Sequence, residues 1–307
     1  MALYSVTRFR LSLFYLILLL TFKALAALPK RTLWFHDSCS EGAVGIVWEE
    51  MQDMLRLASP ATNLNAWSDA GKYFRLVWGD NREDTFKFVK DTVDAVNPEM
   101  ATLKEDANTY IYCDDDERWS PPGKTPGIAD DLWYDAENRI TFKPTTSFGG
   151  LQPGCKYNDD DKPPGSWVVN GQTYCDVLPS GKRGSCAISI CKYISDYVYV
   201  AVSQTEVSPQ DSSANYIDQY VFFSGTLLHE LAHTIENYYT GDKWKDRGPH
   251  PYRWQAVVAK KGTEALTNAE NLAYWGLGCI LMSRGVAINE NGGFRILRPL
   301  RNQPIVN

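Results

Sequence analysis

The chain has 307 residues, of which 44% are hydrophobic and 22% charged, and its formal net charge is −6 at pH 7. A chain of this length can bury the core of one large domain. The acidic balance and the lack of Lys/Arg clusters exclude nucleic acid as a partner, because phosphate binding depends on clustered positive charge.

The first 26 residues have the pattern of a secretory signal peptide. Arg8 and Arg10 precede the apolar run LSLFYLILLLTF, and the segment ends at Ala26 in ALA. A basic start, a brief apolar core and a small-x-small end are typical of a cleaved signal. The apolar run is too short to favour a membrane anchor. We therefore expect a secreted, extracellular protein with no membrane attachment after cleavage, and with 28 basic against 37 acidic side chains once Arg8, Arg10 and Lys23 are removed.

Lys30 and Arg31 form a dibasic pair just beyond this segment. In a secreted protein the pair can be a processing site that gives a mature start at Thr32, or it can be an ordinary basic pair near a flexible terminus. The predicted organisation is a signal peptide at 1–26, a short segment at 27–31 that processing would remove, and a single domain at 32–307.

The cysteines indicate a disulfide framework. In an oxidising compartment six of the seven can form three disulfides and leave one thiol. Cys279 lies in the apolar stretch LAYWGLGCILM, so we expect it to be the free one. No Cys-x-x-Cys pair is present, which disfavours a cysteine zinc site. All seven lie beyond the predicted signal peptide: Cys39, Cys113, Cys155, Cys175, Cys186, Cys191 and Cys279.

The apolar spacing predicts amphipathic helices over 40–58 and 84–97. In the middle third, the β-prone pieces NTYIYC, NRITFK, SWVVNG and YVYVAVS are separated by Gly, Pro and Asp. The chain is then expected to be helical over 215–239 and, after a polar loop over 240–254, again over 263–285. Helices, then irregular strands, then two helices predict an α+β fold.

Two acidic runs, CDDDERW at 113–119 and YNDDDKPPG at 157–165, raise the question of calcium binding. A calcium loop needs alternating oxygen ligands, a glycine turn and a distal Glu. Neither run has this form, so both are expected to be solvated loops.

The stretch GTLLHELAHTIENYY holds two of the four histidines, His229 and His233. On a helix, residues four apart lie on one face, so both imidazoles can reach one metal ion. Glu230 lies about 100° around the helix, where it can act on a water molecule without being a ligand. This is the His-Glu-x-x-His arrangement of zinc peptidases, in which zinc is the Lewis acid and Glu230 the general base. The alternative is two partly buried, hydrogen-bonded histidines.

A catalytic zinc site usually has three protein ligands. The metzincin pattern would place a glycine and a histidine where this chain has Glu236 and Tyr239, so that class is excluded. Of the two other histidines, His36 is remote in sequence and His250 lies between two prolines. Spacing leaves four carboxylates open as the third ligand: Glu264 and Glu270 in the following helix, and Asp242 and Asp246 in the loop.

The segment ALTNAENLAYWGLG after the loop resembles the Asn-Ala-Asp-x-Tyr-Ala-like segment of the deuterolysin-type aspzincins, which are secreted fungal zinc metalloendopeptidases. It departs from that segment at Glu270, where the family has Asp, and at Leu272, where Tyr is common. LWFHDSCSEGAVGIVWEEMQDMLRLA and FRLVWGDNREDTFKFVKDTVDAV are also similar to fungal relatives of this group. The resemblance spans most of the chain beyond the predicted signal peptide, and HELAH is its only sharp motif. It implies a zincin-like fold and one zinc ion per chain, and we expect a monomer.

Members of this family take the third ligand from an Asp in a Gly-Thr-x-Asp-x-x-Tyr-Gly segment. The nearest counterpart here is KDRGPHPYR, in which Asp246 and Tyr252 are spaced further apart. The resemblance thus implies that Asp246 is the third zinc ligand and that Tyr252 donates a hydrogen bond to the oxyanion. Asn268 and Glu270 would then orient the ligands or fix the helix.

The predicted function is therefore hydrolysis of extracellular proteins or peptides by a secreted zinc endopeptidase. One alternative is a non-proteolytic, zinc-scavenging antigen with a zincin-like domain. Such proteins often carry His- or Cys-rich tails, which the segment RILRPLRNQPIVN does not provide. A structural domain without metal is the remaining alternative.

Overall fold

The structure is a computed structural model that describes residues 30–59, 68–113, 118–143, 171–177, 183–191, 216–219, 223–235 and 253–297. Arg31–Asn307 form one compact unit and Met1–Lys30 another. The predicted signal peptide, the strand piece YVYVAVS and the acidic run at 157–165 lie outside the described residues. None of the helices in the described ranges is long and apolar enough to cross a membrane.

The unit Arg31–Asn307 is a mixed α+β fold, as the sequence predicted. Its described helices are α2 (Glu41–Ala58), α3 (Asp69–Trp78), α4 (Glu83–Val96), α6 (Phe223–His233), α7 (Trp254–Ala259), α8 (Thr263–Leu266) and α9 (Ala269–Ser283), with 3-10 turns η1 (Lys104–Asp106) and η5 (Ile217–Gln219).

The main sheet has five described strands in the order β2-β1-β3-β8-β7. Strands β2, β1, β3 and β8 run parallel to one another, whereas β7 is antiparallel to β8. The strands of this sheet are β1 (Thr32–Phe35), β2 (Glu99–Met100), β3 (Thr109–Tyr112), β7 (Gly171–Val177) and β8 (Arg183–Ile190). A second sheet is formed by β4 (Trp119–Ser120), β5 (Trp133–Asp135) and β6 (Ile140–Phe142), and a hairpin by β9 (Val286–Ile288) and β10 (Phe294–Ile296).

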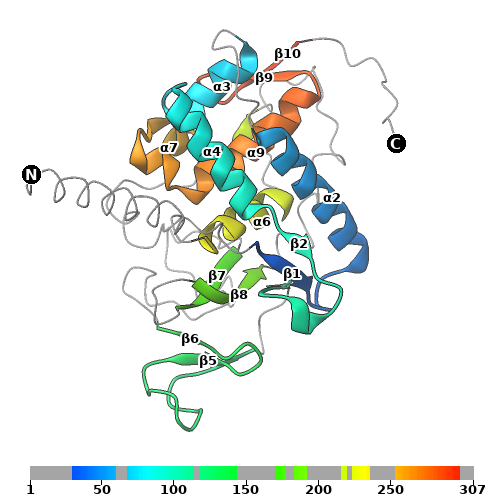
Figure 1. The fold of residues 1–307 in the computed structure, drawn as a ribbon, viewed down its shortest axis with the longest axis vertical. Helices are drawn as coiled ribbons and strands as arrows, with labels where there is room; N and C mark the ends of the chain where they lie inside the picture. Colours follow the sequence, from blue (N-terminus) through cyan, green and yellow to red (C-terminus); the bar gives the residue numbers. More distant parts are fainter. Residues whose placement is uncertain are drawn as a thin grey trace, which may run out of the picture. The chain divides into compact units, whose positions relative to one another are not determined.

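Helix α6 occupies the middle of this unit (Figure 1). It packs against α2 and α9 on one side and against β7 and β8 on the other. Most of its residues are therefore buried, including Phe223, Leu227 and Leu231. The His-Glu-x-x-His motif thus lies between the helices and the main sheet.

The two helices predicted from apolar spacing are confirmed as α2 and α4. Helix α3 was not predicted, although its ends carry ordinary signals. The Ser68 hydroxyl accepts a hydrogen bond from the Gly71 N–H (3.0 Å), which is the interaction of an N-cap. Gly79 ends the helix in the left-handed conformation, with φ of 87°.

The two helices predicted in the C-terminal third are shorter than expected. Within the described part of 215–239, the predicted helix is α6, preceded by η5. Helix α6 ends at His233, where the Thr234 N–H bonds to the Leu231 carbonyl three residues back. The helix predicted over 263–285 is divided into α8 and α9. Asn268 lies at this break with an extended backbone, and its buried side chain donates to the Asn271 side chain.

Two further predictions have mixed outcomes. NTYIYC and NRITFK do contain β3 and β6. The acidic residues of the run at 113–119, at 114–117, lie outside the described residues. The prediction of a solvated loop is wrong for the last two residues of the run, because the side chains of Arg118 and Trp119 are buried. The Arg118 Nε lies 3.2 Å from Oδ2 of the buried Asp135, and this ion pair ties β4 to β5.

The disulfide prediction holds for the described cysteines. Cys39 is bonded to Cys113, which joins the start of α2 to the end of β3. Cys175 is bonded to Cys186, which crosslinks β7 to β8, and Cys191 is also disulfide-bonded. As expected, Cys279 is a free thiol, buried in α9.

Candidate functional site

The two histidines of the motif face one another at the end of α6. Their Nε2 atoms are 3.1 Å apart and their ring centroids 4.9 Å apart. Two nitrogens bound to one tetrahedral zinc ion, each at about 2.0–2.1 Å, would be roughly 3.3 Å apart. His229 and His233 therefore fit adjacent positions on a single zinc ion.

Glu270, in the first turn of α9, contacts the opposite side of the His229 ring. Its Oε2 lies 2.7 Å from Nδ1 of His229, and the two side chains are only 12% and 14% exposed. A carboxylate at Nδ1 keeps the proton there and leaves the Nε2 lone pair for a metal. Because this contact is on the Nδ1 side, Glu270 is placed to orient His229 rather than to share a metal with its Nε2.

Glu230 is 5% exposed and packs against β7. The Thr173 hydroxyl donates to its Oε2 at 2.7 Å and also contacts its carbonyl oxygen at 2.9 Å. Gly171, two residues earlier on β7, lies directly against the same side chain. The carboxylate that sequence analysis predicts to be the general base is thus held by the sheet.

Burial is the largest single influence on the pKa values of His229 and Glu230. It lowers the pKa of His229, but the hydrogen bond and charge of Glu270, with the charge of Glu230, outweigh it and raise that pKa above its ordinary value. Burial raises the pKa of Glu230, and the negative charge of Glu270 adds to it, against the opposing effects of His229 and Thr173. A base whose pKa is raised toward neutrality is better suited to exchange protons with water.

Polar contacts hold both ends of α6. At its start, the Ser224 hydroxyl donates to Oε1 of the buried Glu50 (2.8 Å), which brings a negative charge to the helix N-terminus. At its end, the buried Arg31 guanidinium donates to the Thr234 carbonyl and to the Gly184 carbonyl on β8. A mature chain that starts at Thr32 would lack Arg31, so processing after Arg31 would remove both of these hydrogen bonds.

The other predicted site residues are not at this centre or are not described. Within the described ranges, no group of three or more His, Cys, Asp and Glu side chains is placed to hold a metal ion. His36 bonds to Ser38 and its ring packs against that of Tyr112, and Asn268 lies directly before α9, where its side chain bonds to that of Asn271. Glu264 lies in α8 and belongs to no such group of described side chains. The other candidates lie outside the described residues, so their roles stay predictions: Asp242, Asp246, His250 and Tyr252.

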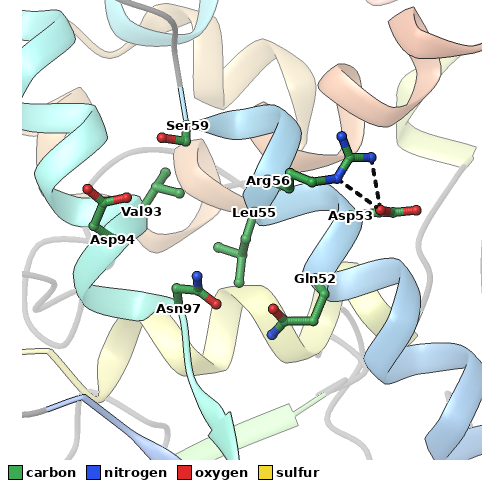
Figure 2. Close-up of a pocket in the computed structure, with 8 residues that line it drawn as sticks. All are labelled: Gln52, Asp53, Leu55, Arg56, Ser59, Val93, Asp94 and Asn97. Carbon is green, nitrogen blue, oxygen red and sulfur yellow. Dashed lines mark hydrogen bonds and ion pairs between the residues drawn. The ribbon is translucent and has the colours of Figure 1, made fainter.

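A pocket of about 510 Å³ between α2 and α4 is separate from the motif (Figure 2). Its carboxylates are already paired, Asp53 with Arg56 (3.0 Å) and Asp94 with Lys90. None of the three motif residues lines it, so it is not the candidate site. Its lining consists of Gln52, Asp53, Leu55, Arg56, Ser59, Val93, Asp94 and Asn97.

Sequence analysis missed the residues that support the motif from other elements. Thr173, Glu50 and Arg31 contact α6 across sequence separations of 57, 174 and 203 residues. Such contacts leave no local pattern, because each partner lies far from α6 in the sequence. No protein-family model matches the chain, and a search of curated proteins finds no match.

The Glu270 contact leads to a prediction on metal affinity. Replacing Glu270 with Ala should weaken zinc binding by about 10- to 100-fold, because the loss of a hydrogen-bonded partner frees the orientation and tautomer of a histidine ligand. Competition with a chromophoric chelator measures this affinity. The exposed Glu49 on α2 provides the control Glu49→Ala. Equal affinities in the two variants would mean that Glu270 does not act on a metal ligand.

Proposed function

We propose that the protein is a zinc-dependent endopeptidase that acts outside the cell on proteins or peptides. The observation that carries this proposal is the pairing of the two Nε2 atoms at 3.1 Å, with Glu270 at the far nitrogen of His229. The adjacent Glu230 adds a buried carboxylate with a raised pKa. Two histidines, an orienting carboxylate and a nearby base are the chemistry of a hydrolytic zinc site.

The proposed roles of His229, His233 and Glu230 are supported by their positions, and those of Asp246 and Tyr252 by the resemblance to the aspzincins. His229 and His233 would hold the metal, and the proposed third ligand is Asp246. A zinc ion supplies a Lewis acid that polarises a peptide carbonyl and makes water easier to deprotonate. Glu230 takes a proton from the attacking water and returns one to the leaving amine. Tyr252 is the proposed donor to the oxyanion of the tetrahedral intermediate.

Secretion is supported by the cysteine chemistry. Disulfides such as Cys39–Cys113 and Cys175–Cys186 form and persist in oxidising compartments. The N-terminal segment ending at Ala26 has the composition of a signal peptide. Both features agree with a peptidase that acts outside the cell, and the zincin-like assignment rests on the resemblance of its sequence to the aspzincins.

Metal removal tests the proposal directly. The purified protein should contain about one zinc ion per chain, as expected for a catalytic site, and should hydrolyse casein. Treatment with 1,10-phenanthroline should abolish hydrolysis, and added Zn²⁺ should restore it. Zinc content, measured by mass spectrometry of the metal, and the casein rate are followed on the same samples.

The other outcomes separate the alternatives. One zinc ion per chain without hydrolysis would favour the zinc-scavenging protein. Absence of bound zinc after dialysis against Zn²⁺ would mean that His229 and His233 are a hydrogen-bonded pair with no metal. Hydrolysis that persists in the chelator would contradict a zinc mechanism.

A further inference from the structure

The Thr173 side chain on β7 contacts Glu230 twice, through the carboxylate and through the carbonyl of the same residue. The carbonyl belongs to the last turn of α6, where the Thr234 N–H bonds to Leu231 rather than to Glu230. A helix end leaves such carbonyls without their usual intrahelical donor. The single hydroxyl hydrogen of Thr173 is therefore shared between the carbonyl at the end of α6 and one carboxylate oxygen of the same residue.

Gly171 bounds the other side of the same carboxylate. It lies two residues before Thr173, so both face the same side of β7. A Cβ at this position would lie 2.9 Å from Cγ of Glu230 and 3.0 Å from its Oε1. Any larger residue would push the Glu230 side chain out of its position, because atoms at such distances overlap. Oε2 thus lies at Thr173 and Oε1 beside Gly171.

We propose that β7 positions the general base, with Thr173 and Gly171 as its positioning residues; this inference rests on the proposed peptidase function. A glutamate has three rotatable side-chain bonds, and a base must be held close to one geometry to act efficiently. The hydroxyl fixes Oε2, which leaves Oε1 to take the proton from water. Strand β7 can serve as a rigid support because Thr173 pairs with Ile188 on β8 and Cys175 is bonded to Cys186.

A simpler role for Thr173 would be to stabilise the end of α6 through the Glu230 carbonyl alone. The two roles differ in what they predict for catalysis. A helix-capping role affects the stability of the fold and leaves turnover by the folded enzyme unchanged. A positioning role lowers kcat while KM and zinc content stay the same, because neither substrate binding nor the histidines depend on the hydroxyl.

The test compares Thr173→Val, which removes the hydroxyl at nearly constant volume, with Thr173→Ser, which retains it. Thr141 on β6 is exposed and supplies the matched control Thr141→Val. We expect Thr173→Val to lower kcat for casein by about 10- to 100-fold, the range for loss of a supporting hydrogen bond, with KM and zinc content close to those of the parent. Thr173→Ser should recover most of the rate, and Gly171→Ala should lower kcat in the same way.

A second measurement uses the metal-free protein and does not depend on activity. A double-mutant cycle with Thr173→Val and Glu230→Ala measures whether the two side chains are coupled in unfolding by guanidinium. The midpoint of the double variant should lie above the value expected from adding the two single effects. Additive effects would mean that Thr173 does not hold the Glu230 side chain.

The failures of the inference and of the proposed function are distinguishable. A parent protein that hydrolyses casein, with Thr173→Val at the parent kcat, would overturn the positioning role alone. A loss of the same size in Thr141→Val would do so as well. A parent protein that binds zinc but does not hydrolyse casein would overturn the proposed function, and the positioning role with it.

Discussion

Replacing Glu230 with Gln should lower the rate of casein hydrolysis by about 10²- to 10⁴-fold, the usual contribution of a general base. Glutamine has the size of glutamate, and its amide oxygen can still accept the hydrogen bond from Thr173. It therefore fits between Gly171 and Thr173 without the overlap that a bulkier residue would cause. The amide has no basic lone pair that can take a proton from water, so only the chemical step is lost.

Zinc content separates this role from that of a ligand. Because Glu230 is rotated away from the faces of His229 and His233, the variant should retain the zinc content of the parent. The matched control is Glu49→Gln, on the exposed face of α2, which should hydrolyse casein at the parent rate. A Glu230→Gln variant that loses its zinc would show that this carboxylate holds the metal, and a variant with the parent rate would remove Glu230 as the base.

The sequence predicted the parts of the fold that have a local, periodic signal. Helices α2 and α4 each bury one face, so their apolar residues recur at helical spacing. Helix α9 is buried on nearly all sides, so its apolar run gave no such period and its start at Ala269 was missed. Strand β8 was missed for a related reason, since RGSCAISI joins turn-forming Gly and Ser to residues that are buried on both faces.

In the candidate site, too, the sequence identifies only those residues that have a local signal. His229, Glu230 and His233 could be identified from sequence because the geometry of one helix turn fixes their relation. The orienting role of Glu270 was one of two alternatives, and only its contact with Nδ1 separates them. Thr173 and Gly171 could not be found, because the approach of β7 to α6 is decided by packing across the whole unit.

Close helix packing around α9 depends on two glycines. At Gly276, a Cβ would lie 2.6 Å from Cδ2 of Leu228, so the absence of a side chain allows α6 to approach α9. At Gly278, a Cβ would overlap with the ring of Tyr73 on α3. The Tyr73 ring cannot move aside, because it is stacked between Trp254 and Trp275, each 5.6 Å away, and its hydroxyl donates to the Tyr274 carbonyl.

Gly278→Ala should therefore destabilise the fold by about 1–3 kcal/mol or more, as expected for overpacking in a rigid core. For a domain of this size, the thermal midpoint should fall by roughly 2–4 °C for each kcal/mol. The matched control is Gly45→Ala on the exposed side of α2, where a Cβ meets nothing within 4 Å. That substitution should raise stability by up to about 1 kcal/mol, because Ala favours a helix over Gly. Equal midpoints for the two variants, measured with the disulfides intact, would mean that Tyr73 can yield and that α3 and α9 are not packed as tightly as their side chains indicate.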